Sequence, residues 1–120
     1  MDELKLCDSD YAVMNIIWTH GPLSSRSLVD HCAQELGWKK STTYTVLKKL
    51  CDRGFAENRD STVSPLIPRE RVQAYESHRI VDRSFSGSLP KFLVSFLEDR
   101  KLTLEEAREL LSLIEQHKEG

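Results

Sequence analysis

The chain is poor in the residues that mark several large classes of protein. Its 120 residues include only 3 Cys, 5 Gly and 4 Pro, and aromatic residues make up 8%. The cysteines Cys7, Cys32 and Cys51 lie far apart, which argues against a disulfide framework. No Cys-x-x-Cys pair or clustered His/Cys spacing indicates zinc. We therefore expect neither a bound metal nor a cofactor.

Long hydrophobic runs are also missing. No apolar run approaches the roughly 18–20 residues of a membrane helix, and residues 1–5 lack the pattern of a secretory signal. We therefore expect a cytoplasmic chain without membrane contact. There is no paired-carboxylate, Ser-His or Cys-His arrangement and no Gly-rich phosphate loop. An enzyme is thus the weakest interpretation, and no catalytic residue is assigned.

The composition allows a folded domain with a modest core, since 39% of the residues are apolar and 30% are charged. The net charge of −2 hides a local basic segment. Between Trp38 and Arg59 there are six basic residues and two acidic ones. This local surplus of positive charge in an otherwise acidic chain favours contact with a polyanion.

Apolar spacing predicts three helices in the first half of the chain, followed by two short strands. The helices are expected at residues 8–19, 24–36 and 40–53, and the strands at 55–58 and 62–65. Asp8 and Ser24 are the expected caps of the first two helices. The turn between the strands, at 59–61, has poor chemistry for a tight primed turn. This element order indicates a winged helix-turn-helix domain over residues 1–67.

The helix expected at residues 40–53 has two different faces. Thr43, Val46, Leu47 and Leu50 form an apolar stripe, and small hydroxyls and lysines lie opposite. Lysines can meet phosphates, and Ser and Thr can reach base edges. Thr43 fits a position in the core as well as it fits a DNA contact. Thr42 could instead form a hydrogen bond at the start of the helix. The candidate DNA-binding residues are Lys39, Lys40, Ser41, Thr42, Thr43, Tyr44, Thr45, Lys48, Lys49 and, in the hairpin, Arg59.

Residues 68–120 are expected to be helical and to form a dimerisation region. A connecting helix over 68–85 precedes a helix capped by Ser88 and another that begins with the capping box Thr103–Glu106. The apolar stripes of these helices could form a monomer core, but this half lacks enough other apolar partners, which favours a homodimer. The candidate interface residues are Leu89, Phe92, Leu93, Phe96, Leu97, Leu110, Leu111 and Ile114.

The tryptophans and cysteines each allow two interpretations. Trp18 and Trp38 could stack on bases, but both flank apolar seams, so we favour core packing. Cys32 and Cys51 could belong to a redox switch, but their apolar neighbours favour small buried side chains. Cys7 is expected to be more exposed, although no neighbouring base would activate it.

Five segments, in this order, resemble motifs of the penicillinase-repressor family of transcriptional regulators. They are DYAVMNIIW at residues 10–18, GPLSSR at 21–26, WKKSTTYTVLKKL at 38–50 with Arg53-Gly54 after it, SPLI at 64–67 with Arg69-Glu70, and FSGSL at 85–89. The resemblance implies a mainly α fold with a small β-wing, in which a winged helix-turn-helix domain precedes a C-terminal helical dimerisation region. It also implies a homodimeric transcriptional repressor that binds double-stranded DNA. Its binding sites would be inverted-repeat operators of β-lactamase, methicillin-resistance or copper-homeostasis operons.

In the antibiotic branch of that family, an upstream membrane sensor protease signals, and cleavage between Asn and Phe in the dimerisation region releases the DNA. The matching pair here is Ser95-Phe96, so release by proteolysis, by a ligand or by competition stays open. The paired C-terminal cysteines of the copper branch are absent, because no cysteine follows Cys51. The hairpin is also shorter than in typical antibiotic repressors, and Arg59 is its one cationic candidate.

A rival hypothesis is a winged-helix module that binds a partner protein and no specific DNA. The short hairpin and acidic total charge favour it, and the lysine and hydroxyl face argues against it. On the repressor hypothesis, Lys48→Ala and Lys49→Ala weaken binding to all DNA sequences. Thr45→Ala mainly relaxes specificity at one position.

Overall fold

The computed structural model describes residues 3–120 and divides the chain into two compact units, Met1–Ser77 and His78–Gly120. The boundary between these units falls inside a helix, α4 (Arg69–Ser84). We call them the first and the second unit. The functional division at residue 67 that the sequence suggests stays a prediction.

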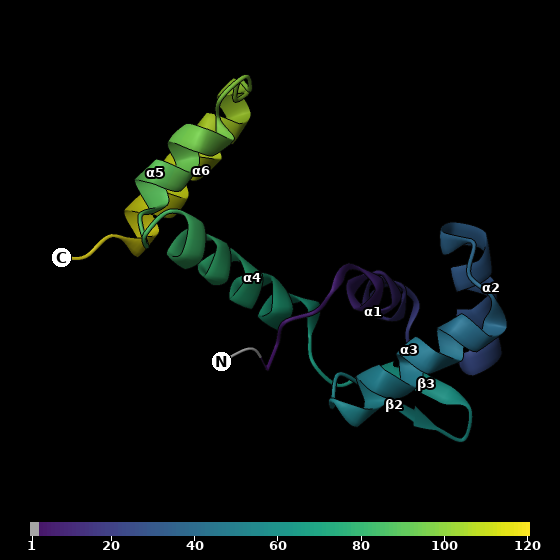
Figure 1. The fold of residues 1–120 in the computed structure, drawn as a ribbon. Helices are drawn as coiled ribbons and strands as arrows, with labels where there is room; N and C mark the ends of the chain where they lie inside the picture. Colours follow the sequence, from purple (N-terminus) through teal and green to yellow (C-terminus); the bar gives the residue numbers. More distant parts are fainter. Residues whose placement is uncertain (1–2) are drawn as a thin grey trace. The chain divides into compact units, whose positions relative to one another are not determined.

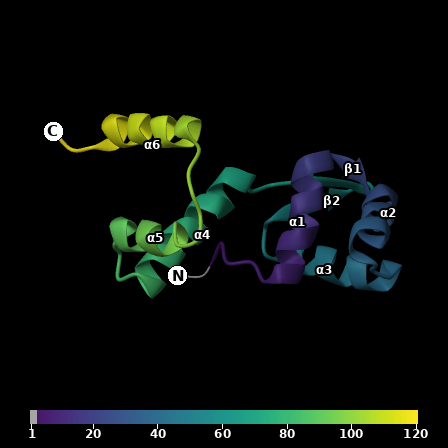
Figure 2. The same cartoon turned by 90° about the horizontal axis from the view of Figure 1, so that it is seen from above.

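The first unit is mainly helical with a small sheet, which confirms the predicted fold class (Figure 1). Before α4 it contains α1 (Asp8–His20), β1 (Leu23–Ser24), α2 (Ser25–Leu36), α3 (Lys40–Asp52), β2 (Ala56–Arg59) and β3 (Thr62–Pro65). The strands form an antiparallel sheet in the order β1-β3-β2. Strand β1, in the connection from α1 to α2 (Figure 2), was missed because two residues carry no periodic signal.

Two local predictions in this unit were wrong. Cys7, and not Asp8, is the N-cap of α1, since Asp8 already belongs to the helix. The hairpin has a tight two-residue turn, because Arg59 pairs with Thr62 and the two residues between them have positive φ angles. Asp60 has φ 52° and Ser61 has φ 60°, as primed turns require. The predicted cap of α2 is confirmed, because Ser24 accepts a hydrogen bond from the Ser27 N–H.

One apolar core holds the helices and the sheet of the first unit together. It includes Met14 and Ile17 of α1, Leu28 of α2, Phe55 before β2 and Val72 of α4, all fully buried. Trp18 and Trp38 are half-buried against this core, which confirms the core interpretation of both. The Trp18 indole also donates a hydrogen bond to the Ile67 carbonyl at 2.8 Å. Among the cysteines, Cys32 is buried and Cys7 is exposed, as predicted, whereas Cys51 is only half-buried.

The second unit contains the end of α4, then α5 (Leu89–Phe96) and α6 (Leu104–His117). Both predicted helix starts are confirmed: Ser88 caps α5, and Thr103 and Glu106 form the capping box of α6. No side chain of this unit is fully buried. Helices α5 and α6 instead line an apolar groove of about 380 Å³.

Candidate nucleic-acid interface

Helix α3 presents a polar face to solvent because its opposite face is fixed in the core. Thr43, Val46, Leu47 and Leu50 are buried at helical spacing, so the helix can take only one rotation about its axis. The remaining candidates on this helix are exposed: Lys40, Ser41, Thr42, Tyr44, Thr45, Lys48 and Lys49. The two faces predicted from the sequence are confirmed, although DNA contact itself stays a prediction.

Thr43 belongs to the core, which corrects its place among the candidate DNA contacts. Its side chain is fully buried, and its Oγ1 donates to the Lys39 carbonyl at 3.3 Å. Thr43 also hydrogen-bonds the Cys32 thiol, whose pKa is nevertheless raised because burial disfavours the thiolate. A buried hydroxyl held in this way cannot reach a base edge.

The exposed polar side chains of α3 are arranged within one helix face. The Thr45 hydroxyl donates to the Ser41 carbonyl at 2.9 Å, which leaves its oxygen available as an acceptor. The Lys40 ammonium lies 6.0 Å from the centre of the Tyr44 ring. Lys48 pairs with Asp52 at 3.0 Å, but both side chains are largely exposed, so phosphate can replace this carboxylate at little cost.

Lys49 has a structural partner that the sequence did not reveal. Its ammonium lies 2.9 Å from Oδ1 of Asp10, and the Asp10 side chain is only 4% exposed. Arg53 approaches the other oxygen of Asp10 at 3.7 Å. The hydrogen bond to Asp10, together with its negative charge, raises the pKa of Lys49. Lys49 therefore ties α3 to the start of α1, through a carboxylate that it shares with Arg53.

Two arginines that were not singled out as functional also form hydrogen bonds between distant segments of the first unit. Arg53 donates to the carbonyls of Glu3 and Lys5 at 3.2 and 2.8 Å. Arg69 donates to Oδ1 of Asn15 at 2.9 Å and to the Thr19 hydroxyl at 2.8 Å. These residues are distant in sequence, so only the positions of Arg53 and Arg69 inside family-like motifs could have indicated a role.

The hairpin adds one exposed cation to the surroundings of α3. The Arg59 side chain is 77% exposed at the end of β2 and pairs with Glu57 on the same strand at 3.1 Å. Lys39, the N-cap residue of α3, is exposed as well. Apart from Lys49, which pairs with Asp10, the exposed cations among the candidates are Lys39, Lys40, Lys48 and Arg59.

Comparison with known proteins agrees with this geometry. The sequence model described as penicillinase repressor matches residues 6–116. The chain belongs to the penicillinase repressor family. The penicillinase repressor of Bacillus licheniformis is 27% identical over 118 residues, which cover 95% of this chain and 92% of that protein. The methicillin resistance regulatory protein MecI of Mammaliicoccus sciuri is 20% identical over 114 residues, 92% of this chain and 93% of MecI.

Membership of the penicillinase repressor family confirms the resemblance seen in the sequence. It is a family of transcriptional repressors and not of enzymes. A shorter match, 33% identical over 51 residues, is to an uncharacterised 16.5 kDa protein of Latilactobacillus sakei. No helix within residues 3–120 is both long and apolar enough to cross a membrane.

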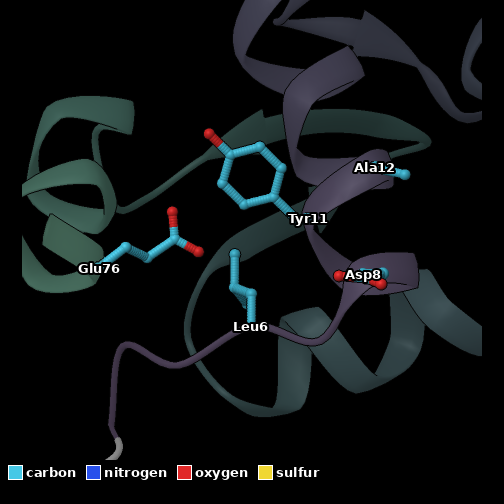
Figure 3. Close-up of a pocket in the computed structure, with 5 residues that line it drawn as sticks. All are labelled: Leu6, Asp8, Tyr11, Ala12 and Glu76. Atoms are coloured by element: carbon cyan, nitrogen blue, oxygen red, sulfur yellow. The ribbon is translucent and has the colours of Figure 1, made fainter. Parts of the chain in front are cut away.

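A shallow hollow elsewhere on the first unit does not suit DNA. It measures about 340 Å³ and lies between α1 and α4, lined by Leu6, Asp8, Tyr11, Ala12 and Glu76. Figure 3 shows Tyr11 and Glu76 reaching into the same space from the two helices. Its two carboxylates would repel phosphate, so this hollow is not part of the candidate interface.

The candidate dimer residues of this family member fall into two groups in the second unit. Phe92, Leu93, Phe96, Leu97 and Leu110 line the groove between α5 and α6. Three more candidates do not line it and are more than half exposed: Leu89, Leu111 and Ile114. An exposed apolar surface of this kind is typical of an interaction site.

Proposed function

We propose that this member of the penicillinase repressor family represses transcription as a homodimer on an inverted-repeat operator. In this proposal, α3 of each copy enters a major groove of the DNA. The observation that carries the proposal is the exposed hydroxyl and lysine face of α3, opposite a buried stripe that fixes its orientation.

The exposed side chains divide between positioning and reading the DNA. Lys39, Lys40 and Lys48 are proposed to contact phosphates, and Arg59 extends this contact from the hairpin. Ser41 and Thr45 are short hydroxyl side chains that can donate to or accept from base edges. Thr42 and Tyr44 flank this face and complete it.

The proposed homodimer forms through the second unit. The exposed candidates Leu89, Leu111 and Ile114 and the groove between α5 and α6 support this step, because a symmetric partner would cover them. Pairing two copies fixes the distance between their α3 helices. The two half-sites should therefore lie about one helical turn apart, or a small multiple of it.

The controlled genes and the release signal are proposed from the relatives. Their names refer to penicillinase and to methicillin resistance, so we propose an operon for β-lactam resistance or a related stress. An upstream sensor protease is the proposed partner for release. Support comes from the exposed Ser95 and Phe96, the last two residues of α5. A sensor-protease gene beside this one would agree with this circuit.

The test is a titration of the full-length protein on its own upstream DNA, at two salt concentrations and with random DNA as competitor. With about three to four phosphate contacts per copy, log affinity should fall with log salt at a slope near −5 to −7. Lys48→Ala should weaken binding to every sequence, and Thr45→Ala should mainly relax specificity at one position. Lys101→Ala, an exposed lysine of the second unit, is the matched control.

Binding no tighter than binding to random DNA, with no change in Lys48→Ala, would refute the repressor proposal for this DNA. A winged-helix module that binds a partner protein would then be the better hypothesis. A chromatin-wide search for bound sites would separate that outcome from an operator elsewhere in the genome.

A further inference from the structure

A cluster of metal-ligating side chains lies outside the proposed DNA-binding face. His20 is the last residue of α1, and His31 and Glu35 lie four residues apart on α2. One ligand atom from each of the three lies within 4.8 Å of the other two. We propose that this cluster binds one divalent transition-metal ion of the zinc class.

The donor set fits such an ion. Two imidazole nitrogens and one carboxylate oxygen are ligands that zinc accepts, and they leave a fourth position for water. A His and a Glu four residues apart lie on the same face of a helix, so α2 alone supplies a bidentate arrangement. The sequence did not indicate this site, because His20 comes from another helix and its spacing to His31 matches no zinc motif.

The backbone under the three ligands is rigid. Leu28 and Cys32 of α2 are fully buried, which fixes the rotation of that helix and turns His31 and Glu35 to its flank. On α1, Ile17 is fully buried, and its carbonyl accepts the Gly21 N–H at 2.7 Å just after His20. The backbone positions of the three ligands are therefore held without a bound ion, and only their side chains have to move.

The side chains must turn to close around an ion, because the nitrogen lone pairs of two stacked imidazole rings lie in nearly parallel planes and do not converge. The His20 and His31 rings are stacked with centroids 4.0 Å apart and planes 16° from parallel. His31 Nδ1 lies 3.1 Å from a Glu35 carboxylate oxygen. Bonds of about 2.0–2.1 Å in a tetrahedron place ligand atoms about 3.3 Å apart. His20 and Glu35 are exposed and can move inward, and an ion would replace the contact between His31 and Glu35.

The local field also favours a cation. His20 lies at the C-terminal end of α1, where the helix dipole is negative. The bound ion would link the end of α1 to α2, two helices that pack together in the first unit. Since the three ligands meet only in the folded chain, binding should stabilise the first unit as metal concentration rises.

The test is calorimetric titration of the full chain, free of any histidine tag, with ZnCl₂, and with MgCl₂ as the control salt. We expect saturable binding of one zinc ion per chain, a zinc-dependent rise in the melting temperature, and no response to magnesium. His20→Ala, His31→Ala and Glu35→Gln should each weaken zinc binding by roughly tenfold or more. Two matched variants should bind zinc as the wild type does: His117→Ala, an exposed histidine of the second unit, and Cys7→Ser, which removes the exposed thiol.

The proposal is overturned if zinc does not bind saturably, or if the His20→Ala and His31→Ala double variant binds it unchanged. Loss of binding in Cys7→Ser would likewise place the metal elsewhere. His31 is half-buried, so His31→Gln is a second variant to use if His31→Ala does not fold. The far-UV circular dichroism spectrum of each variant establishes that it is folded. The outcome is independent of the DNA titration, because it uses no DNA.

Discussion

The two units of the chain differ in how they satisfy their apolar side chains. The first unit buries residues from four helices and a sheet in one core, and the second unit buries none completely. Yet helices α5 and α6 of the second unit have well-formed N-termini. Ser88 caps α5, and Thr103 and Glu106 form a capping box at the start of α6. Local sequence can thus start a helix without supplying anything for it to pack against, and most helix stability comes from that packing.

Among changes that test this difference between the units, the removal of an aromatic side chain from the core should have the largest effect on stability. Phe55 is fully buried, so Phe55→Ala should lower the free energy of unfolding of the first unit by about 3–5 kcal/mol. Phe92→Ala, at a partly exposed site of the second unit, should cost the first unit little. Urea unfolding followed by Trp fluorescence measures the first unit, because both tryptophans belong to it. If both variants lowered the free energy of unfolding of the first unit equally, the proposed difference between the two units would be wrong.

The next effect concerns the second unit as an interface. Leu93 lines the groove between α5 and α6, and Leu93→Arg should weaken the dimer by about 2 kcal/mol or more, roughly thirtyfold. The neighbouring Val94 is 75% exposed and lines no part of the groove, so Val94→Arg is its control. Sedimentation velocity over a concentration series measures both. A wild-type chain that stays monomeric at all concentrations would refute the interface.

Two adjacent lysines on α3 should respond in opposite ways. Lys49→Met should lower the urea midpoint of the first unit, because it leaves the buried Asp10 carboxylate with the more distant Arg53, 3.7 Å away, as its ion-pair partner within residues 3–120. Lys48→Met should leave stability nearly unchanged, since its pair with Asp52 is exposed. In DNA titrations, Lys48→Met should reduce the salt slope by about 1 for each lost phosphate contact. If Lys49→Met instead reduced the salt slope of DNA binding and left stability unchanged, Lys49 would be a DNA contact and not a structural residue.

A smaller effect tests the burial of the cysteines. Cys7 is exposed and should react readily with a thiol reagent in the folded chain. Burial raises the pKa of the Cys32 and Cys51 thiols, so both should react more slowly, with Cys32 the slowest. Mass spectrometry after timed labelling, with and without urea, gives the order. Labelling of Cys32 before Cys7 would show that this core opens easily.

The smallest expected effect is a loss of stability at alkaline pH. A raised pKa in the folded chain means that the folded state holds its proton more tightly, so this stability is present at neutral pH and is lost as pH rises. The loss should begin near the ordinary cysteine pKa of 9.0 and continue above that of lysine, 10.5. Urea midpoints from pH 8 to 11 measure it. Cys51→Ala should reduce the first part of the fall.

Sequence reasoning succeeded where a periodic pattern or a cap carried the information. The buried stripe of α3 and the Ser24 cap of α2 were both predicted in this way. It could not decide Thr43, because threonine has a methyl group for a core and a hydroxyl for DNA. It also missed contacts between residues distant in sequence, such as Lys49 with Asp10, since no local signal specifies the partner.

The tip of the hairpin is joined to the start of α2, which limits how this chain can evolve. The Ser25 N–H donates to the Ser61 carbonyl at 2.9 Å, and Ser24 both pairs with Thr62 and caps α2. Insertions usually accumulate in surface loops at little cost. Here an insertion at Asp60 or Ser61 would disturb the first turn of a neighbouring helix as well as the loop. A lineage that lengthens this wing must therefore replace two sets of interactions at once.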